Sequence, residues 1–315
     1  MTDEPGGRAE LADVLARMPQ WQGRDVAAEV LKGGLSHLTY HVDAGGERCV
    51  VRILNRDIDR YLLGIRPEHE IENTIRAAET GVGPGVVAAF PDLPAMVLEY
   101  VDGATFHVEQ VRDAANIPRI GRACRALHDG ARPFVNDFDI FRHLDGFLDI
   151  CRRNGLRIPD AYESYLPAVA RIEAALAARA REPVSCHNDL LAENIMDDGS
   201  SIRIVDYQLS GRHDRCFELG DLAAESDFTP DDVERLCEGY FGERLPGQVA
   251  RTRLYLIMSN FTWTLWFSVH SGLVEPNPDV QFDYWEEALD KWSQAVRDLD
   301  SPGFGGLLDQ ARSAA

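Results

Sequence analysis

The sequence predicts an α+β fold with two lobes: a small N-lobe built on a five-stranded antiparallel sheet, and a larger, mainly helical C-lobe. Three observations support this prediction. Short apolar runs separated by glycine turns fill residues 21–101, as in a strand-rich lobe. Helix-length apolar patterns dominate residues 102–299. One hairpin-like stretch, residues 183–206, interrupts these helices and carries a group of polar side chains.

Composition limits the classes of protein to consider. The 315 residues can bury a substantial core in two lobes. The formal net charge of −20 argues against a nucleic-acid partner, because phosphate neutralisation needs basic patches. The six cysteines include no C-x-x-C pair, so neither a zinc site nor a disulfide framework is indicated.

The hydropathy pattern indicates a cytoplasmic protein. Residues 1–7 are polar and acidic, unlike a signal peptide. The most apolar run, residues 254–269, is too short and too polar to span a bilayer, so no stable membrane insertion is expected. The sequence does not set the oligomeric state.

The N-lobe elements follow from local patterns. Within residues 1–20 we expect an amphipathic helix at 8–18, with its apolar side chains on one side. Pro67 near the first turn and Gly81 just past the end predict a helix at 67–80. The five strands are expected at 29–32, 38–42, 48–54, 86–90 and 95–101.

The C-lobe is expected to be helical on both sides of the hairpin. Thr229 and Pro230 form a good helix start, with a capping side chain, a proline at the first position and acids after it. Residues 300–315, rich in Gly, Ser and Ala, are expected as a tail that can fray. The predicted helices cover 108–129, 138–154, 160–181, 217–227, 230–241, 247–271 and 282–298.

The hairpin carries a pattern suited to phosphoryl transfer. His187, Asp189 and Asn194 have the spacing H-x-D-x-x-x-x-N, and Asp206 ends the strand that follows. Transfer from ATP needs one carboxylate to accept a hydroxyl proton and two oxygen ligands for Mg²⁺. Asp189 is the candidate base, and Asn194 and Asp206 are the candidate Mg²⁺ ligands. His187 is expected to hydrogen-bond the backbone and hold the loop. The pattern predicts a kinase active site.

A second group of residues is suited to bind the nucleotide. Gly33, Gly34 and Ser36 lie between two predicted strands, where backbone N–H groups can approach phosphates. Arg52 follows on the third strand, where protein kinases carry a lysine for the α- and β-phosphates. Glu70, on the next helix, is a candidate to orient Arg52 as an ion pair.

The end of the fifth strand predicts the connection between the lobes. The backbone groups of Glu99 and Val101 are expected to hydrogen-bond adenine, so that the residue types there matter little. An ordinary strand ending in a turn explains this segment equally well.

Taken in order, these residues resemble the choline/ethanolamine kinases, small-molecule members of the aminoglycoside phosphotransferase-like branch of the protein-kinase-like fold. The resemblance covers about residues 28–298, and the catalytic hairpin is its most specific part. It implies that Asp189 is the base and that Asn194 and Asp206 bind Mg²⁺. The residues that carry it are Gly33 to Ser36, Arg52, Glu70, Cys186 to Asp189, Asn194 and Asp206.

The resemblance also implies a site for a small cationic amino alcohol. It places Glu225, Trp263 and Trp266 around the substrate ammonium, and the similarity reappears at Tyr284. Aromatic faces and a carboxylate suit a quaternary ammonium, which cannot donate strong hydrogen bonds. The alternative is that Trp263 and Trp266 belong to the core and do not contact the substrate. Glu287 falls near the place where choline-specific relatives tend to carry a tyrosine, which favours a primary or a larger polyhydroxylated amine.

Three functions are therefore open. The first is an ATP-dependent kinase of choline or ethanolamine, and the second is a kinase of another hydroxylated amine, such as an aminoglycoside or thiamine. The third is a catalytically inactive nucleotide-binding regulator. The last is disfavoured because Arg52, Glu70, Asp189, Asn194 and Asp206 are all intact.

Overall fold

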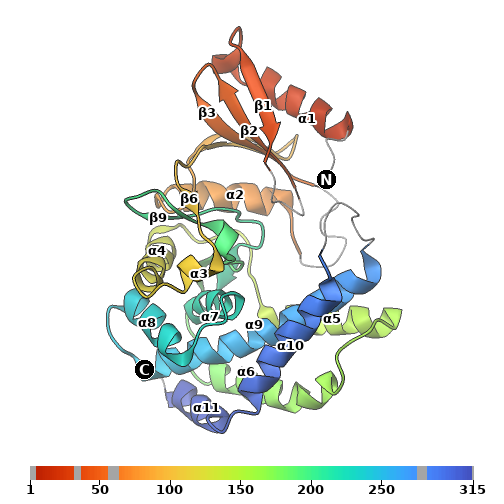
Figure 1. The fold of residues 1–315 in the computed structure, drawn as a ribbon, viewed down its shortest axis with the longest axis vertical. Coiled ribbons are helices and arrows are strands. Elements are labelled where there is room, and N and C mark those ends of the chain that lie inside the picture. The colour runs from red at the N-terminus through yellow and green to blue at the C-terminus, as the bar shows by residue number, and fades with distance from the viewer. Residues whose placement is uncertain (1–4, 32–36, 56–63, 275–281, 314–315) are drawn as a thin grey trace.

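The computed structural model describes residues 5–31, 37–55, 64–274 and 282–313. The described chain forms two lobes, with a sheet at one end and a larger body of helices below it (Figure 1). The predicted α+β class, with a small sheet-bearing N-lobe and a helical C-lobe, is confirmed.

The N-lobe is built on one five-stranded sheet in which every neighbouring pair is antiparallel. Its order is β1-β2-β3-β5-β4, with the register shift of a bulge between β4 and β5. The predicted sheet is therefore confirmed. The strands are β1 (Val26–Val30), β2 (Leu38–Ala44), β3 (Arg48–Ile53), β4 (Val86–Phe90) and β5 (Ala95–Glu99).

Two helices cover opposite faces of this sheet. Val14 of α1 (Pro5–Ala16) packs in one cluster with Val97 of β5, and a 3-10 turn at Pro19–Trp21 follows α1. Ile71 of α2 (Pro67–Ala78) packs with Met96 of β5 instead. Successive side chains of a strand point to opposite faces of the sheet. The contacts of Val97 and Met96 therefore place α1 on one face and α2 on the other.

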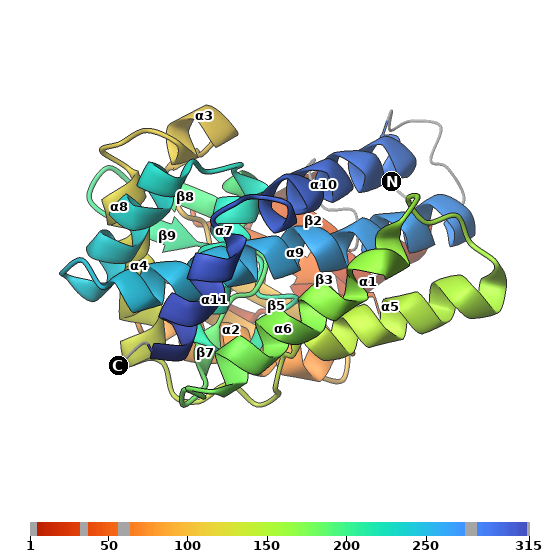
Figure 2. The ribbon, with the colours of Figure 1, turned by 90° about the horizontal axis from the view of Figure 1, so that it is seen from below.

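The C-lobe is arranged around one long helix, α9, which is buried along most of its length. Helices α5, α7, α10 and α11 pack against it, and Figure 2 shows it crossing the middle of the lobe. A helix that is apolar on every side is stable only when neighbours cover it all round. The C-lobe helices are α3 (Val108–Val111), α4 (Ile117–Gly130), α5 (Ile140–Asn154), α6 (Leu166–Ala177), α7 (Arg215–Glu225), α8 (Pro230–Phe241), α9 (Pro246–Leu273), α10 (Tyr284–Leu299) and α11 (Phe304–Ser313).

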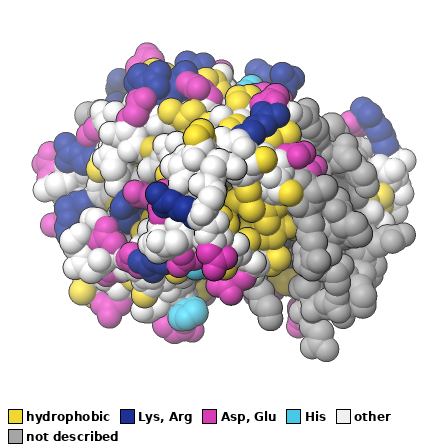
Figure 3. Space-filling view, turned by 90° about the horizontal axis from the view of Figure 1, so that it is seen from above, with side chains coloured by type: hydrophobic (Ala, Val, Ile, Leu, Met, Phe, Trp, Pro, Cys, Tyr) yellow, Lys and Arg dark blue, Asp and Glu magenta, His cyan; other side chains and the backbone are white. Residues whose placement is uncertain are grey.

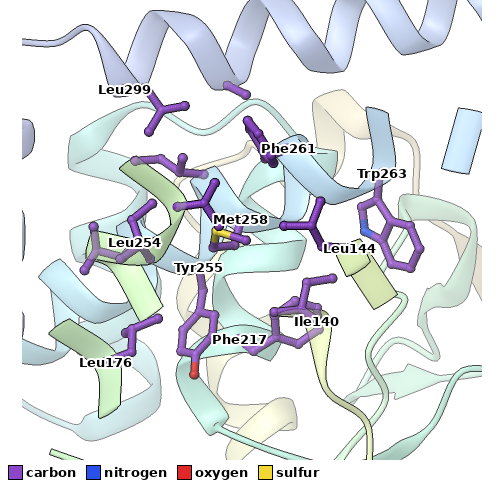
Figure 4. Packing of buried hydrophobic residues seen from close by; sticks show 14 of the residues in the cluster. Ile140, Leu144, Leu176, Phe217, Leu254, Tyr255, Met258, Phe261, Trp263 and Leu299 are labelled. Carbon is purple, nitrogen blue, oxygen red and sulfur yellow. The ribbon is translucent and has the colours of Figure 1, made fainter. Parts of the chain in front are cut away.

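The largest buried cluster lies where these helices meet α9. Leu254, Met258 and Phe261 of α9 pack against side chains of α5, α6, α7 and α10 (Figure 4). Trp263 lies at the margin of the side chains drawn there. The cluster therefore extends toward the end of α9 on which Trp263 and Trp266 stand.

Short strands carry the catalytic segment. β8 (Ile195–Asp197) and β9 (Ile202–Ile204) form the predicted antiparallel hairpin, and β6 (Ala104–Thr105) pairs with β8. β7 (Val184–Cys186) pairs instead with β10 (Gly211–His213). Residues 183–206 are thus divided between two small sheets, with the segment from His187 to Asn194 spanning the space between them; a 3-10 turn covers Ala192–Asn194.

Two predicted helices are shorter than expected, in each case because of a proline. The range 108–129 divides into α3 and α4, with Pro118 in the first turn of α4. The range 160–181 divides into a 3-10 turn at Tyr162–Tyr165 and α6, with Pro167 in the first turn of α6. Proline lacks the N–H of a helix interior and is tolerated only in the first turn.

The expectation of a tail that can fray is wrong. Residues 304–313 form α11, which packs against α6 and α9. Phe304, Leu307, Leu308 and Ala311 are buried, at the spacing of one helix face. The apolar periodicity of this segment outweighs its content of small residues.

The surface agrees with the composition. Acidic side chains are spread over the face seen from the N-lobe end, with basic side chains among them and a band of apolar side chains near the middle (Figure 3). The six cysteines are all buried and none forms a disulfide. Within the described residues, no helix has the length and apolar character that crossing a membrane requires.

Candidate active site

The loop that carries Asp189 is held from beneath by a buried carboxylate. Asn188 has a φ of +66°, so the chain turns sharply just before Asp189. Glu218 of α7 accepts hydrogen bonds from the backbone N–H of His187 at 2.9 Å and of Asn188 at 2.7 Å. His128 of α4 lies 3.3 Å from the same carboxylate. Charge-assisted bonds to two successive amides fix the turn.

His187 has the structural role that its position predicts. Its Nδ1 accepts a 3.3 Å hydrogen bond from the Asp189 N–H, so the proton is on Nε2, which donates to the Val205 carbonyl at 2.8 Å. Both ring nitrogens are therefore occupied by backbone groups. His187 ties the start of the catalytic loop to the strand that leads to Asp206.

The structure brings Asp189, Asn194 and Asp206 together. Asn194 donates a 2.8 Å hydrogen bond from Nδ2 to the Asp189 carbonyl, and this fixes which end of the amide is engaged. Its Oδ1 is then the end left to bind a cation. Burial raises the pKa of Asp189 well above its usual range, and the charges of Asp221, Asp206 and Glu225 raise it further. The site is thus rich in carboxylates.

Arg52 connects the two lobes at this site. Its Nε donates to Glu70 Oε1 at 2.7 Å, and its Nη2 forms an ion pair with Asp206. His37 lies on the far side of Glu70: the Asn55 N–H donates to its Nδ1, so its Nε2 donates to Glu70 Oε2 at 3.1 Å. Burial alone would raise the pKa of Glu70, but Arg52 and His37 outweigh it and lower that pKa. The predicted Arg52–Glu70 pair is present.

Only some of the other residues expected to bind the nucleotide lie within the described part of the chain. Gly33, Gly34 and Ser36 lie outside the described residues. Glu99 uses its N–H for a 2.8 Å bond to Gly85 and its side chain for an ion pair with Arg203. Within the described chain, nothing accepts a hydrogen bond from the Val101 N–H. That amide is available to a ligand.

A buried aspartate joins the catalytic loop to the tryptophan helix. Asp221 Oδ1 accepts hydrogen bonds from Ser259 at 2.8 Å and from Trp263 Nε1 at 3.0 Å, while Oδ2 accepts a 3.3 Å bond from the Leu190 N–H. Burial, followed by the charge of Glu225, raises the pKa of Asp221 to about 7. The residue next to Asp189 is therefore positioned by the same carboxylate that orients Trp263.

The aromatic residues expected to bind substrate form one continuous series of ring contacts. The rings of Trp263 and Trp266 are nearly perpendicular, with centroids 6.5 Å apart. Trp266 lies 3.7 Å from His270 and 6.2 Å from Tyr284, centroid to centroid. Trp263 is 7% exposed and belongs to the core cluster, whereas Trp266 is only partly buried. The two alternatives for the tryptophans are thus not exclusive, because the series begins in the core and leaves it.

Glu225, which the resemblance assigns to the substrate ammonium, already has a partner in the structure. Its Oε1 is 2.7 Å from Nζ of Lys291, a residue of α10 that is 6% exposed. Glu287 lies one turn before Lys291 on the same helix and is partly buried. Burial and the nearby Asp290 raise the pKa of Glu287, with a smaller raising effect from Glu225. Glu225 and Glu287 are therefore close enough for their charges to interact, and Lys291 pairs with Glu225.

The comparisons with known proteins agree with this geometry. Residues 27–255 match the family model described as "Phosphotransferase enzyme family". The chain belongs to this family. It is 22% identical over 311 residues to mouse ethanolamine kinase 2, covering 88% of this chain and 77% of that protein.

Solved structures give the same fold. A choline/ethanolamine kinase family protein from Mesorhizobium loti superposes with a TM-score of 0.83 at 28% identity, covering 98% of this chain and 99% of the other. The choline kinase LicA from Streptococcus pneumoniae has a TM-score of 0.72 at 20% identity, covering 92% and 99%. The resemblance to the choline/ethanolamine kinases and the kinase-like fold are thereby confirmed, and the protein is a phosphotransferase.

The residues of the site that were not predicted include His37, Asp221 and Lys291. Asp221 precedes Glu225 by four residues, which is one helical turn, so the sequence held a signal for it. Lys291 occupies a position in the buried stripe of α10 otherwise formed by Ala288, Ala295 and Leu299. A lysine in an apolar stripe indicates a buried partner.

Proposed function

We propose that the protein transfers the γ-phosphate of ATP to the hydroxyl of a small amino alcohol, with choline or ethanolamine as the first candidates. The observation that carries this proposal is the convergence of Asp189, Asn194 and Asp206, with Arg52 of the N-lobe paired to Asp206. Asp189 is the catalytic base. It accepts the proton of the acceptor hydroxyl while that oxygen bonds to the γ-phosphorus and the bond to the β–γ bridging oxygen breaks, which releases ADP.

Magnesium fits the donor set. Asn194 Oδ1 and the Asp206 carboxylate are hard oxygen ligands of the kind that Mg²⁺ prefers. They lie beside Asp189, whose pKa is raised by burial and by neighbouring acids. When bound, the ion would neutralise charge on the β- and γ-phosphates. Arg52 now donates to Asp206, so we propose that its Nη2 turns to the α- and β-phosphates in the nucleotide complex while Glu70 keeps hold of Nε.

A cationic acceptor follows from the same charges. Burial and the neighbouring acids disfavour the carboxylate form of Asp189, which is the form that accepts a proton. Positive charge beside it restores the carboxylate form. An ammonium near Asp221 and Glu225 supplies such charge from one side, as Mg²⁺ does from the other. The backbone N–H of Val101 is the proposed contact for adenine.

A kinase of a larger hydroxylated amine, such as an aminoglycoside or thiamine, is the second candidate. The observation that favours it is the additional acidic group at Glu287, close to Glu225. A coupled assay of ADP release over choline, ethanolamine, thiamine and a set of aminoglycosides decides between the two. Release that depends on choline or ethanolamine supports the first candidate. Release only with the larger amines supports the second, and Mg-ATP binding with no release on any acceptor contradicts both.

A further inference from the structure

The acidic site beside Trp263 already contains a cation. Lys291 reaches from α10 to Glu225 of α7, with 2.7 Å between Nζ and Oε1, and the two side chains are 7% and 15% exposed. Asp221 lies one turn before Glu225 on α7, and Glu287 lies one turn before Lys291 on α10. Lys291 therefore pairs directly with one carboxylate to which a substrate ammonium would bind, and its charge also acts on Asp221 and Glu287.

We infer that Lys291 is a specificity-determining residue: a tethered ammonium that competes with the substrate's cationic group for Glu225. This inference rests on the proposed function, because it concerns the acceptor site of that reaction. A cation that enters beside Glu225 meets a neutral ion pair rather than a free carboxylate. Lys291 thereby weakens the binding of cationic amines, choline and protonated ethanolamine alike, relative to neutral acceptors.

The net charge of the Glu225–Lys291 pair predicts the order of the dissociation constants among the variants. The wild-type pair sums to zero, Lys291→Met leaves −1, and Glu225→Gln leaves +1. The double variant Glu225→Gln/Lys291→Met again sums to zero. The dissociation constant for a cationic amine should therefore be lowest in Lys291→Met and highest in Glu225→Gln, with wild type and the double variant between them. One unit of charge about 4 Å from a cation changes its affinity about five-fold at the dielectric constant of water and on the order of a thousand-fold at an effective dielectric constant of about 20. We therefore expect each change to be about ten-fold or more.

A lysine that merely holds Glu225 in place for the substrate predicts the opposite result. In that case Lys291→Met would misplace Glu225 and weaken amine binding, as Glu225→Gln does. The direction in which Lys291→Met changes the Kd for the amine thus shows whether Lys291 competes with the substrate or positions Glu225 for it. Lys291→Arg keeps the cation and is the matched control, for which we expect little change.

The test is calorimetric binding of choline and of ethanolamine, without nucleotide, to the full-length wild type and the four variants. Titration with a neutral diol controls for general damage. A Kd for choline that falls about ten-fold in Lys291→Met and rises about ten-fold in Glu225→Gln, with the diol unaffected, supports the inference. An unchanged or higher Kd in Lys291→Met overturns it.

A second comparison keeps the inference testable if Lys291→Met does not fold. The double variant removes both charges together, which buried pairs often tolerate. It should bind choline about ten-fold more tightly than Glu225→Gln, and equal binding in these two variants overturns the inference. Because binding needs no turnover, the two proposals can fail separately. If the variants rank as expected but the wild type phosphorylates neither amine, only the proposed function is contradicted.

Discussion

Trp263 Nε1 donates a 3.0 Å hydrogen bond to Oδ1 of Asp221. The same carboxylate accepts the N–H of Leu190, the residue after the candidate base. The indole is therefore oriented by its polar edge, and its orientation is coupled to the catalytic loop.

Trp263→Ala should raise the KM for the amine while leaving the KM for ATP nearly unchanged. A cation–π contact is worth roughly 0.5–2 kcal/mol, which corresponds to a 2- to 30-fold rise. Because Trp263 is also in the core, the variant should lose about 3–5 kcal/mol of stability, and kinetics must be measured well below its Tm. Trp263→Phe keeps an aromatic face but not the bond to Asp221, and should show the smaller change in KM. An unaltered amine KM in a folded Trp263→Ala enzyme argues against this contact.

Glu70→Gln should raise the KM for ATP roughly ten-fold and leave the amine KM unchanged. The substitution weakens the charged hydrogen bond that holds Arg52 Nε, and breaking a buried pair costs about 3–5 kcal/mol of stability. Glu72→Gln is the control, because Glu72 lies on the same helix but pairs with Arg76 near the surface. Equal ATP KM values in the two variants would mean that Glu70 does not position Arg52 for nucleotide.

Asp206→Ala should abolish turnover and weaken nucleotide binding in a magnesium-dependent manner. Without this carboxylate, the phosphate charge is poorly neutralised. Calorimetric titration with ATP, with and without Mg²⁺, measures the effect. We expect the gain in ATP affinity on adding Mg²⁺ to disappear in the variant. If that gain persists, Asp206 is not a ligand of the ion.

The stability of the protein should depend on pH through Asp221. Its pKa is about 7 in the folded chain and about 3.9 in an unfolded one, so the folded protein holds a proton that the unfolded chain releases. The stabilisation from this group is present below about pH 4 and is lost as the pH rises through 7. The difference in unfolding free energy between wild type and Asp221→Asn should then fall by on the order of 3 kcal/mol from pH 4 to 8. Denaturant titrations at several pH values measure it, and parallel pH profiles would contradict the assignment.

The sequence carried enough information for the elements that depend on local patterns. The five strands follow from alternation between glycine turns, and α8 follows from its capping box at Thr229. The break between α3 and α4 required weighing Pro118 against a long apolar pattern. The partners of single polar residues were beyond local reasoning, because Lys291 meets Glu225 and His37 meets Glu70 only through the packing of distant helices and strands.

The most direct test of the central claim is acceptor-dependent ADP release by wild type and by Asp189→Asn. The variant should bind Mg-ATP with nearly wild-type affinity, because the Asp189 carboxylate acts on the acceptor hydroxyl and not on adenine. Loss of a positioned base should lower kcat by about 10²–10⁴. We predict that the wild type releases ADP and forms a phosphorylated amino alcohol, and that Asp189→Asn loses both activities. A variant that keeps more than about a third of wild-type kcat would contradict the account, since a lost base costs far more than that.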